Sequence, residues 1–203
     1  MPNIKVSDLI KRAKTVAQDL DFVQWEESEW LDWYNECILT LVSLRADAFT
    51  AIREIAMDKS ASTYELPADV DRLVDVFDYS KTGRIVRHID RNFLDQQYPY
   101  WRTQASDDGP KYYVYDDNNP RIFHIYPSPL DLTHTLKVVV SAIPSKTSNI
   151  DESISVDERF APAIVDYMLY RGYLKNGDYE DQLARAKFFM DSFYSKLGVS
   201  DDS

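Results

Sequence analysis

The spacing of apolar residues changes twice along this chain of 203 residues, and that change constrains the fold more than any other feature. Near both ends, apolar residues recur every three or four positions, which is typical of a helix with one buried face. In the middle, short β-branched and aromatic runs alternate with turn residues, which is typical of antiparallel strands. The sequence predicts an α+β protein: helical hairpins from residues 1–48 and 151–203 pack as a helical bundle, and residues 49–150 form a central antiparallel β-rich insert.

The amino-terminal segment predicts a hairpin of two helices. Ser7 and Asp8 are typical of a helix start, and we expect this helix to end near Leu20. A second start lies at residues 26–29, whose glutamates favour the positive end of a helix dipole. The residues that follow at steps of three and four predict one wide buried face: Trp30, Tyr34, Cys37, Ile38, Leu41 and Val42.

The carboxyl-terminal segment predicts a second helical hairpin. Its first helix begins at Asp157, and Pro162 is tolerated because it lies near the first turn. Gly177 can end that helix and Asp178 can cap the next, whose apolar periodicity continues to Gly198.

Two predicted hairpins open the middle segment. The first pairs residues 52–55 with 63–66, and the second pairs residues 73–77 with 84–86. Gly83 suits a left-handed position in the turn of the second hairpin.

The rest of the middle segment predicts a third hairpin and a last strand. Residues 111–115 and 122–126 flank typical turn residues and would form the third hairpin. We also expect a short helix at residues 90–97, a long loop at 98–110 and a strand at 135–142.

The sequence carries no recognisable membrane or secretion signal. No apolar run approaches the roughly 20 residues that cross a bilayer, and no apolar stretch follows Met1. We therefore expect synthesis in the cytoplasm and no membrane partner. Cys37 is the one cysteine and cannot form an internal disulfide, which agrees with a reducing compartment.

The charge is acidic and unevenly distributed. Residues 1–48 hold 9 acidic and 5 basic side chains, residues 49–150 hold 14 and 12, and residues 151–203 hold 11 and 6. A formal net charge of -11 disfavours nonspecific binding to nucleic acid, because affinity for phosphate depends on lysine and arginine. The two helical ends therefore carry most of the net charge.

Motifs for catalysis and for cofactors are not recognisable. The five glycines are dispersed, so the sequence has neither a Walker loop nor a Rossmann fingerprint. The three histidines lack partners at ligand spacing, although folding could bring them together. The run at residues 116–119 lacks the glycine and the later glutamate of a calcium loop, which favours a solvated turn. We therefore predict no enzyme activity, no cofactor and no metal site.

Two other functions stay open on the residues alone. The net charge also fits an acidic DNA mimic that inhibits a DNA-binding protein, although lysines and arginines dilute the acidity. General acid and base catalysis needs only two carboxylates whose pKa values differ. The candidates for a carboxylate-dependent hydrolase are Asp107, Asp108, Asp116 and Asp117.

Motifs over most of the chain carry a family resemblance. They are Trp25, Glu29-Trp30-Leu31-Asp32-Trp33-Tyr34-Asn35, Leu44-Arg45-Ala46-Asp47-Ala48, Glu65-Leu66-Pro67, Pro110-Lys111-Tyr112-Tyr113-Val114, Ile125-Tyr126-Pro127-Ser128-Pro129, Ile143-Pro144 and Leu169-Tyr170-Arg171-Gly172-Tyr173. These motifs resemble the head-to-tail adaptor (connector) proteins of short-tailed bacteriophages. In two places the chain departs from the pattern, which has proline where Ala46 stands and alanine where Gly172 stands.

The resemblance implies a structural virion protein at the head-tail interface, made in the host cytoplasm. It implies a homo-oligomeric ring of twelve copies that binds beneath the portal protein and presents a platform for the tail nozzle or tail tube protein. The ring would extend the DNA channel, through which DNA passes without specific binding. An acidic lumen suits this role because it repels phosphate.

A closed ring needs two different surfaces that fit each other. One side of the expected subunit interface combines a basic stretch, which also holds His88, with an aromatic loop: Arg84, Arg87, Arg91, Tyr98, Tyr100, Trp101 and Arg102. The resemblance also implies that the carboxyl terminus points toward the portal. The expected portal-docking residues are Phe193, Tyr194, Leu197 and Val199.

Overall fold

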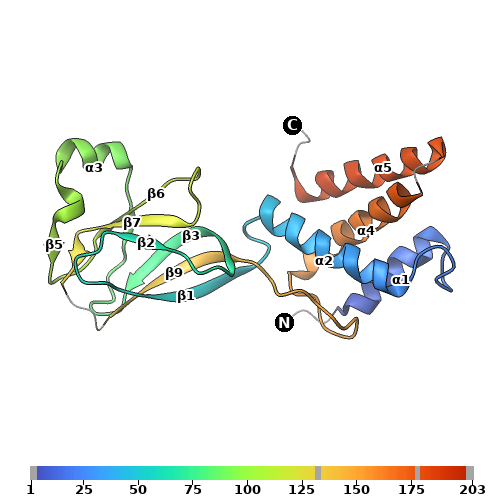
Figure 1. Ribbon diagram of the computed structural model, residues 1–203, viewed down its shortest axis with the longest axis horizontal. Helices are drawn as coiled ribbons and strands as arrows, with labels where there is room; N and C mark the ends of the chain where they lie inside the picture. The colour runs from blue at the N-terminus through green and yellow to red at the C-terminus, as the bar shows by residue number, and fades with distance from the viewer. Residues whose placement is uncertain (1–3, 131–133, 177–178, 200–203) are drawn as a thin grey trace. The chain divides into compact units, whose positions relative to one another are not determined.

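The structure, a computed structural model that describes residues 4–130, 134–176 and 179–199, has one part built from helices and another built mainly from strands (Figure 1). The chain divides into a helical unit, Met1–Phe49 with Pro144–Ser203, and a strand unit, Thr50–Ile143. The α+β class that the sequence predicts is confirmed.

The amino-terminal part of the helical unit consists of α1 (Val6–Ala17) and α2 (Glu27–Leu44). Each helix is capped by a carboxylate in its first turn. Asp8 accepts the Lys5 N–H at 3.0 Å, and Glu29 accepts the Glu26 N–H at 3.2 Å. The first helix ends before the predicted Leu20, because Gln18 adopts a left-handed conformation with φ 60°.

The carboxyl-terminal part consists of α4 (Ala161–Lys175) and α5 (Glu180–Leu197). Pro162 lies in the first turn of α4, and Gly198 ends α5 with φ 68°, as predicted. The predicted helix end Gly177 and cap Asp178 lie outside the described residues. Helix α4 contacts α1, α2 and α5, so the other three helices pack around it. Within the described part of the chain, no helix is long and apolar enough to cross a membrane.

Three tryptophans form the centre of the helical core. The ring of Trp25 meets those of Trp30 and Trp33 edge-on, with centroids 5.3 and 5.9 Å away. A Cβ atom at Gly172 of α4 would lie only 3.2 Å from the Trp25 ring. Glycine therefore makes room for Trp25 at the position where the family resemblance led us to expect alanine.

The strand unit contains a three-stranded antiparallel sheet in the order β1-β9-β3. Its strands are β1 (Thr50–Ala56), β9 (Thr135–Ala142) and β3 (Val70–Tyr79). Strand β9 is central, and its Val138 and Val140 are fully buried. The predicted last strand is therefore confirmed with its exact bounds, and it organises this sheet.

A second sheet has the order β2-β7-β6-β4. Its strands are β2 (Thr63–Glu65), β7 (Ile122–Tyr126), β6 (Tyr112–Tyr115) and β4 (Arg87–His88). The predicted hairpin across residues 116–120 is confirmed as the antiparallel pair β6 and β7. The predicted short helix is α3 (Arg91–Gln97). The segment that we expected to be a loop holds a 3-10 helix, Trp101–Thr103, and β5 (Ala105–Ser106), which pairs with β8 (Ser128–Pro129).

The first two predicted hairpins are wrong in their strand partners. Strand β1 pairs with β9, and β2 pairs with β7. Strand β3 also pairs with β9, and only a single bridge joins Tyr79 to Arg84. Turn residues indicate where the chain reverses, but backbone donors and acceptors are the same on every strand, so burial selects the partner.

Candidate functional site

The structure exposes the three arginines that the sequence analysis placed in a subunit interface. Arg84 follows the turn after β3, Arg87 lies in β4, and Arg91 begins α3. Arg91 forms an exposed ion pair with Asp95 one turn later, at 3.4 Å. Exposed pairs of this kind contribute little to stability. The connection between β3 and α3 therefore presents three cations to solvent.

Trp101 differs from its neighbours because its side chain is only 1% exposed. It packs with Leu94 and Val114, and its Nε1 donates to Asp95 Oδ1 at 2.8 Å. Its ring therefore belongs to the core of the strand unit, which corrects the expectation that Trp101 presents a contact surface. Tyr98 and Tyr100 remain exposed beside it.

Asp95 links the basic stretch to the aromatic loop, because it bonds both Arg91 and Trp101. The hydrogen bond from Trp101, together with the nearby charges of Arg91 and Arg102, lowers the pKa of Asp95 below its usual range. Arg102 also stacks 5.0 Å from the Trp101 ring centroid. The structure thus brings Arg91, Trp101 and Arg102 together.

A polar pocket of about 600 Å³ lies beside α3. Its lining includes His88, Arg91, Asp95, Asn118 and His124. Burial, with Arg102 and Arg91 nearby, lowers the pKa of His124. Among the described residues, no group of three or more His, Cys, Asp or Glu side chains is placed to hold a metal ion.

The four aspartates considered for hydrolysis are all exposed: Asp107, Asp108, Asp116 and Asp117. Asp116 accepts from the N–H and the side-chain amide of Asn118, each at 2.9 Å, and these bonds lower its pKa. A general acid needs a raised pKa instead. Asp116 therefore acts as a turn residue between β6 and β7.

The four predicted portal-docking residues divide into two pairs. Phe193 and Leu197 are buried in the helical core, whereas Tyr194 and Val199 are partly exposed. The Val199 N–H donates to the Tyr194 carbonyl at 3.2 Å, which closes the turn after α5 around Gly198. Phe193 and Leu197 therefore hold the end of α5, and the other two side chains reach the surface.

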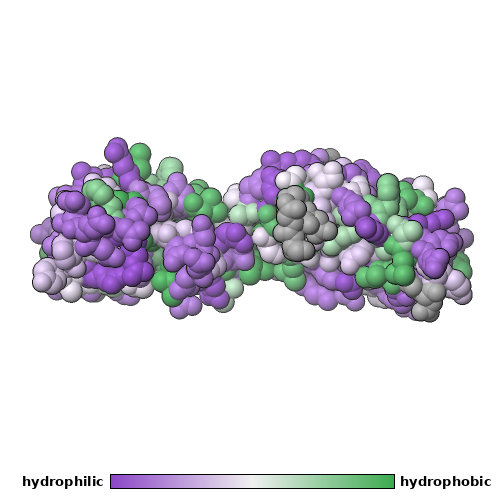
Figure 2. Space-filling model, turned by 90° about the horizontal axis from the view of Figure 1, so that it is seen from above, coloured by the Kyte–Doolittle hydropathy of each residue, from purple (hydrophilic) through white to green (hydrophobic). Residues whose placement is uncertain are grey.

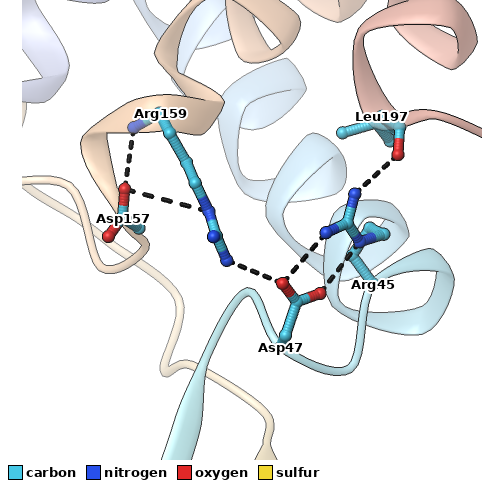
Figure 3. Close-up of polar contacts among 5 residues, drawn as sticks. All are labelled: Arg45, Asp47, Asp157, Arg159 and Leu197. Atoms are coloured by element: carbon cyan, nitrogen blue, oxygen red, sulfur yellow. Dashed lines mark hydrogen bonds and ion pairs between the residues drawn. The ribbon is translucent and has the colours of Figure 1, made fainter.

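A charged network fixes this end of α5 (Figure 3). Arg45, just after α2, donates to the Leu197 carbonyl at 2.6 Å and to both carboxylate oxygens of Asp47 at 2.8 and 2.9 Å. Arg159 donates to the same carboxylate at 2.6 Å, and its backbone N–H donates to Asp157 at 2.9 Å. An arginine suits the carbonyl end of a helix, where partial negative charge collects. The network joins the end of α2, the turn before α4 and the end of α5.

A comparison with protein families identifies the chain. The family model described as SU10 adaptor protein matches residues 4–203. The chain belongs to the SU10 adaptor protein family. It is a phage head-to-tail adaptor, a structural component of the virion, which confirms the resemblance stated above. No curated protein matches the sequence.

The network around Asp47 in this adaptor has no signal in the sequence. Arg45 and Asp47 belong to one of the motifs that carried the family resemblance, but nothing in their spacing indicates a partner. Arg159 lies 112 positions from Asp47 along the chain. Only folding brings the three together.

Asp47→Asn is expected to lower the free energy of unfolding of the adaptor by about 1 kcal/mol at pH 7, discounted for solvent screening. Arg45 holds the pKa of Asp47 below its usual range through their hydrogen bonds. The stabilisation is therefore present above about pH 4 and is lost as the pH falls through the lowered pKa. Urea denaturation of the wild-type protein and of the Asp47→Asn variant, each at pH 7 and at pH 3, measures the difference in their free energies of unfolding.

The control for this prediction is Asp32→Asn, which removes a more exposed ion pair with Lys146. We expect a loss of no more than about 0.5 kcal/mol from this change. Equal losses in the two variants, or a loss for Asp47→Asn that does not shrink at pH 3, would contradict the role of the network.

Proposed function

We propose that the adaptor forms a closed ring of twelve copies that joins the portal protein to the tail nozzle and extends the DNA channel. The observation that carries this proposal is the match of the adaptor family to nearly the whole chain, residues 4–203. In this proposal the helices from the two chain ends act as one bundle, and the strand unit supplies contacts between neighbours.

The exposed cations of the strand unit support a contact between unlike surfaces. Arg84, Arg87 and Arg91 are exposed there together with Tyr98 and Tyr100. The helical unit carries 20 acidic and 12 basic residues, a net charge of -8. Unlike charges favour a heterologous contact, in which one surface of a copy meets a different surface of the next. The buried ring of Trp101 would support the surface of exposed arginines and tyrosines from beneath.

The end of α5 is the proposed portal-docking element. Tyr194 and Val199 are partly exposed, while Phe193 and Leu197 fasten the helix end to the core. Arg45 donates to the Leu197 carbonyl, which holds the end of α5 in place. A docking segment held in place loses less entropy when it binds.

The acidic surplus of the helical unit supports a channel that does not retain DNA. Binding to the phosphate backbone requires lysine and arginine to replace counterions, and this unit has 8 more acidic than basic residues. An acidic lining repels phosphate and lets DNA slide.

Electron microscopy and native mass spectrometry of the full-length adaptor, alone and mixed with its portal protein, test the proposal. We expect rings of twelve copies in at least the mixture. A chain that stays monomeric and does not bind portal would overturn it.

A charge reversal within the strand unit tests the proposed interface. Arg87→Glu is expected to reduce ring formation, whereas Lys59→Glu makes the same charge change at an exposed residue outside the stretch at 84–102. Equal loss of rings in both variants would argue against a specific role of Arg87.

A further inference from the structure

Strand β1 forms one edge of the three-stranded sheet, because β9 is its only neighbour among the described strands (Figure 1). An edge strand offers a row of backbone N–H and C=O groups to an added strand. The opposite edge, β3, is irregular: its pairing with β9 shifts register three times, and its Leu73 N–H donates to the Pro120 carbonyl at 3.2 Å. Strand β1 pairs with β9 without a register shift and contains no proline. It is therefore the regular edge of this sheet.

The bonds of β9 show which residues of β1 point outward. Beside the end of β3, the Thr135 carbonyl accepts from the Ser80 N–H at 3.0 Å. Beside its start, the Ile143 N–H donates to the Asp69 carbonyl at 2.8 Å. Odd-numbered residues of β9 therefore bond toward β3, and even-numbered ones bond to residues 51, 53 and 55 of β1. The residues of β1 that direct their N–H and C=O groups away from the sheet are Thr50, Ile52, Glu54 and Ala56.

No described segment covers this outward row. All four of its residues are exposed, and Ile52 is 63% exposed. Among the described residues, none donates to or accepts from their outward backbone groups. Backbone groups in this spacing are satisfied by another extended backbone, so the occupant that fits the edge is a strand.

The charges on β1 favour a second copy of the chain as that occupant. A formal net charge of -11 makes two copies repel each other over most of their surfaces. On β1 the charges are balanced instead. Arg53 pairs with Asp69 at 3.0 Å, and Glu54 lies opposite Lys137 of β9. The face of the strand unit in Figure 2 is mostly hydrophilic and does not favour contact by apolar burial, whereas an edge supplies hydrogen bonds.

Two β1 strands fit each other around a two-fold axis at Ile52. Outward-pointing residues must oppose each other in an antiparallel pair. With the axis at Ile52, this residue lies opposite Ile52 of the second copy. Thr50 then lies opposite Glu54, and Ala51 lies opposite Arg53. An axis at Arg53 or at Glu54 would place like charges directly opposite each other, which is destabilising.

We infer that the free adaptor is a dimer in which the β1 strands of two copies pair antiparallel across a two-fold axis at Ile52. The pairing joins the two β1-β9-β3 sheets into one continuous sheet. A two-fold contact uses the same surface on both copies, whereas neighbours in a closed ring meet through different surfaces. The dimer is therefore a form of the protein that precedes the proposed ring and is not one of the ring contacts.

Disulfide formation in the full-length adaptor without portal tests this contact. Residues opposite each other in a hydrogen-bonded antiparallel pair have Cα atoms about 5.5 Å apart, within the range that a disulfide spans. Mild oxidation of Ile52→Cys is therefore expected to give at least ten times as much covalent dimer as the wild-type protein, measured by non-reducing electrophoresis. The natural Cys37 is buried, so the wild-type protein is expected to give almost none.

The matched control is Thr50→Cys, which lies in the same outward row but opposite Glu54 of the second copy. Alone it is expected to give at least tenfold less covalent dimer than Ile52→Cys. A mixture of Thr50→Cys and Glu54→Cys chains is expected to restore the disulfide, because the register brings these two positions together. Phe77→Cys, 55% exposed on β3, measures the dimer that forms by random collision.

A proline at the same position tests the hydrogen bonds of the edge. Ile52→Pro removes an outward N–H and no bond to β9, as proline is tolerated on an edge strand whose N–H faces solvent. We expect its dimer to dissociate at a concentration at least ten times higher than the wild-type dimer, measured by analytical ultracentrifugation. Circular dichroism of both proteins checks that the variant keeps its fold.

Three results would overturn the inference: a wild-type adaptor that is monomeric in the ultracentrifuge, equal disulfide yields from Thr50→Cys and Ile52→Cys, or an Ile52→Cys disulfide that forms only with a cysteine variant of portal. All other measurements use the adaptor alone, so their outcome does not depend on ring formation. Rings with portal but no free dimer would leave the proposed function standing, and a free dimer that never forms rings would refute the proposed function alone.

Discussion

Gly109→Ala is expected to lower the free energy of unfolding of the strand unit by about 3 kcal/mol, from left-handed strain and overpacking together. Gly109 has φ 71°, a conformation that side chains with a Cβ atom rarely adopt. A Cβ atom there would lie 2.2 Å from Cε1 of Tyr79. Because Tyr79 is fully buried, its ring cannot move aside without disturbing the core.

Gly83→Ala is the matched control, since Gly83 also has a positive φ, of 61°, but no atom lies within 4 Å of its added Cβ. Gly83→Ala is expected to lower the free energy of unfolding by only about 1 kcal/mol, because it adds the left-handed strain without the overpacking. Hydrogen exchange of the β9 amides, followed by mass spectrometry, measures both variants within the strand unit. Similar losses in the two variants would show that the contact with Tyr79 does not limit this position.

Trp30→Ala is expected to lower the free energy of unfolding of the helical unit by about 4 kcal/mol, the usual scale for removing a buried aromatic side chain. Trp30 is fully buried, and its ring lies 5.3 Å from that of Trp25 and 5.2 Å from that of Trp33. The cavity left behind would remove support from both rings. Urea denaturation, followed by circular dichroism at the helix band, measures the loss.

The control is Leu39→Ala on the same helix, whose side chain is more than half exposed. A change at an exposed position is expected to stay within about 0.5 kcal/mol. Trp30→Phe is expected to cost less than Trp30→Ala, because it keeps a ring and removes a buried N–H for which no partner is found among the described atoms. A loss below 1 kcal/mol for Trp30→Ala would contradict the central place of the three tryptophans.

Helix positions could be predicted because helical periodicity is a local signal. Gly198 marks the end of α5 as predicted, whereas the predicted helix start at Asp157 caps a 3-10 helix, Glu158–Phe160, and α4 begins only at Ala161. The end of α1 was placed three residues too late at Leu20, since nothing in the sequence shows that Asp19 turns inward to bind the next backbone N–H groups.

Burial at the candidate surfaces could not be predicted from residue type. Trp101 was expected on a surface beside Tyr98 and Tyr100, but Asp95 and the core of the strand unit hold it inside. Phe193 and Leu197 were expected to dock a partner, but they pack in the helical core. An aromatic or apolar side chain suits a core as well as an interface, and only its neighbours in space decide between them.

The sequence by itself determined the α+β class, the helices near both ends, the hairpin between β6 and β7 and, through its motifs, the adaptor family. The tertiary structure alone decided that β9 lies between β1 and β3, and that Arg45, Asp47 and Arg159 meet at the end of α5. The physical reason is the distance along the sequence over which each signal acts. Periodicity and turn chemistry act over a few residues, whereas strand partners and ion pairs depend on which distant segments must be buried together.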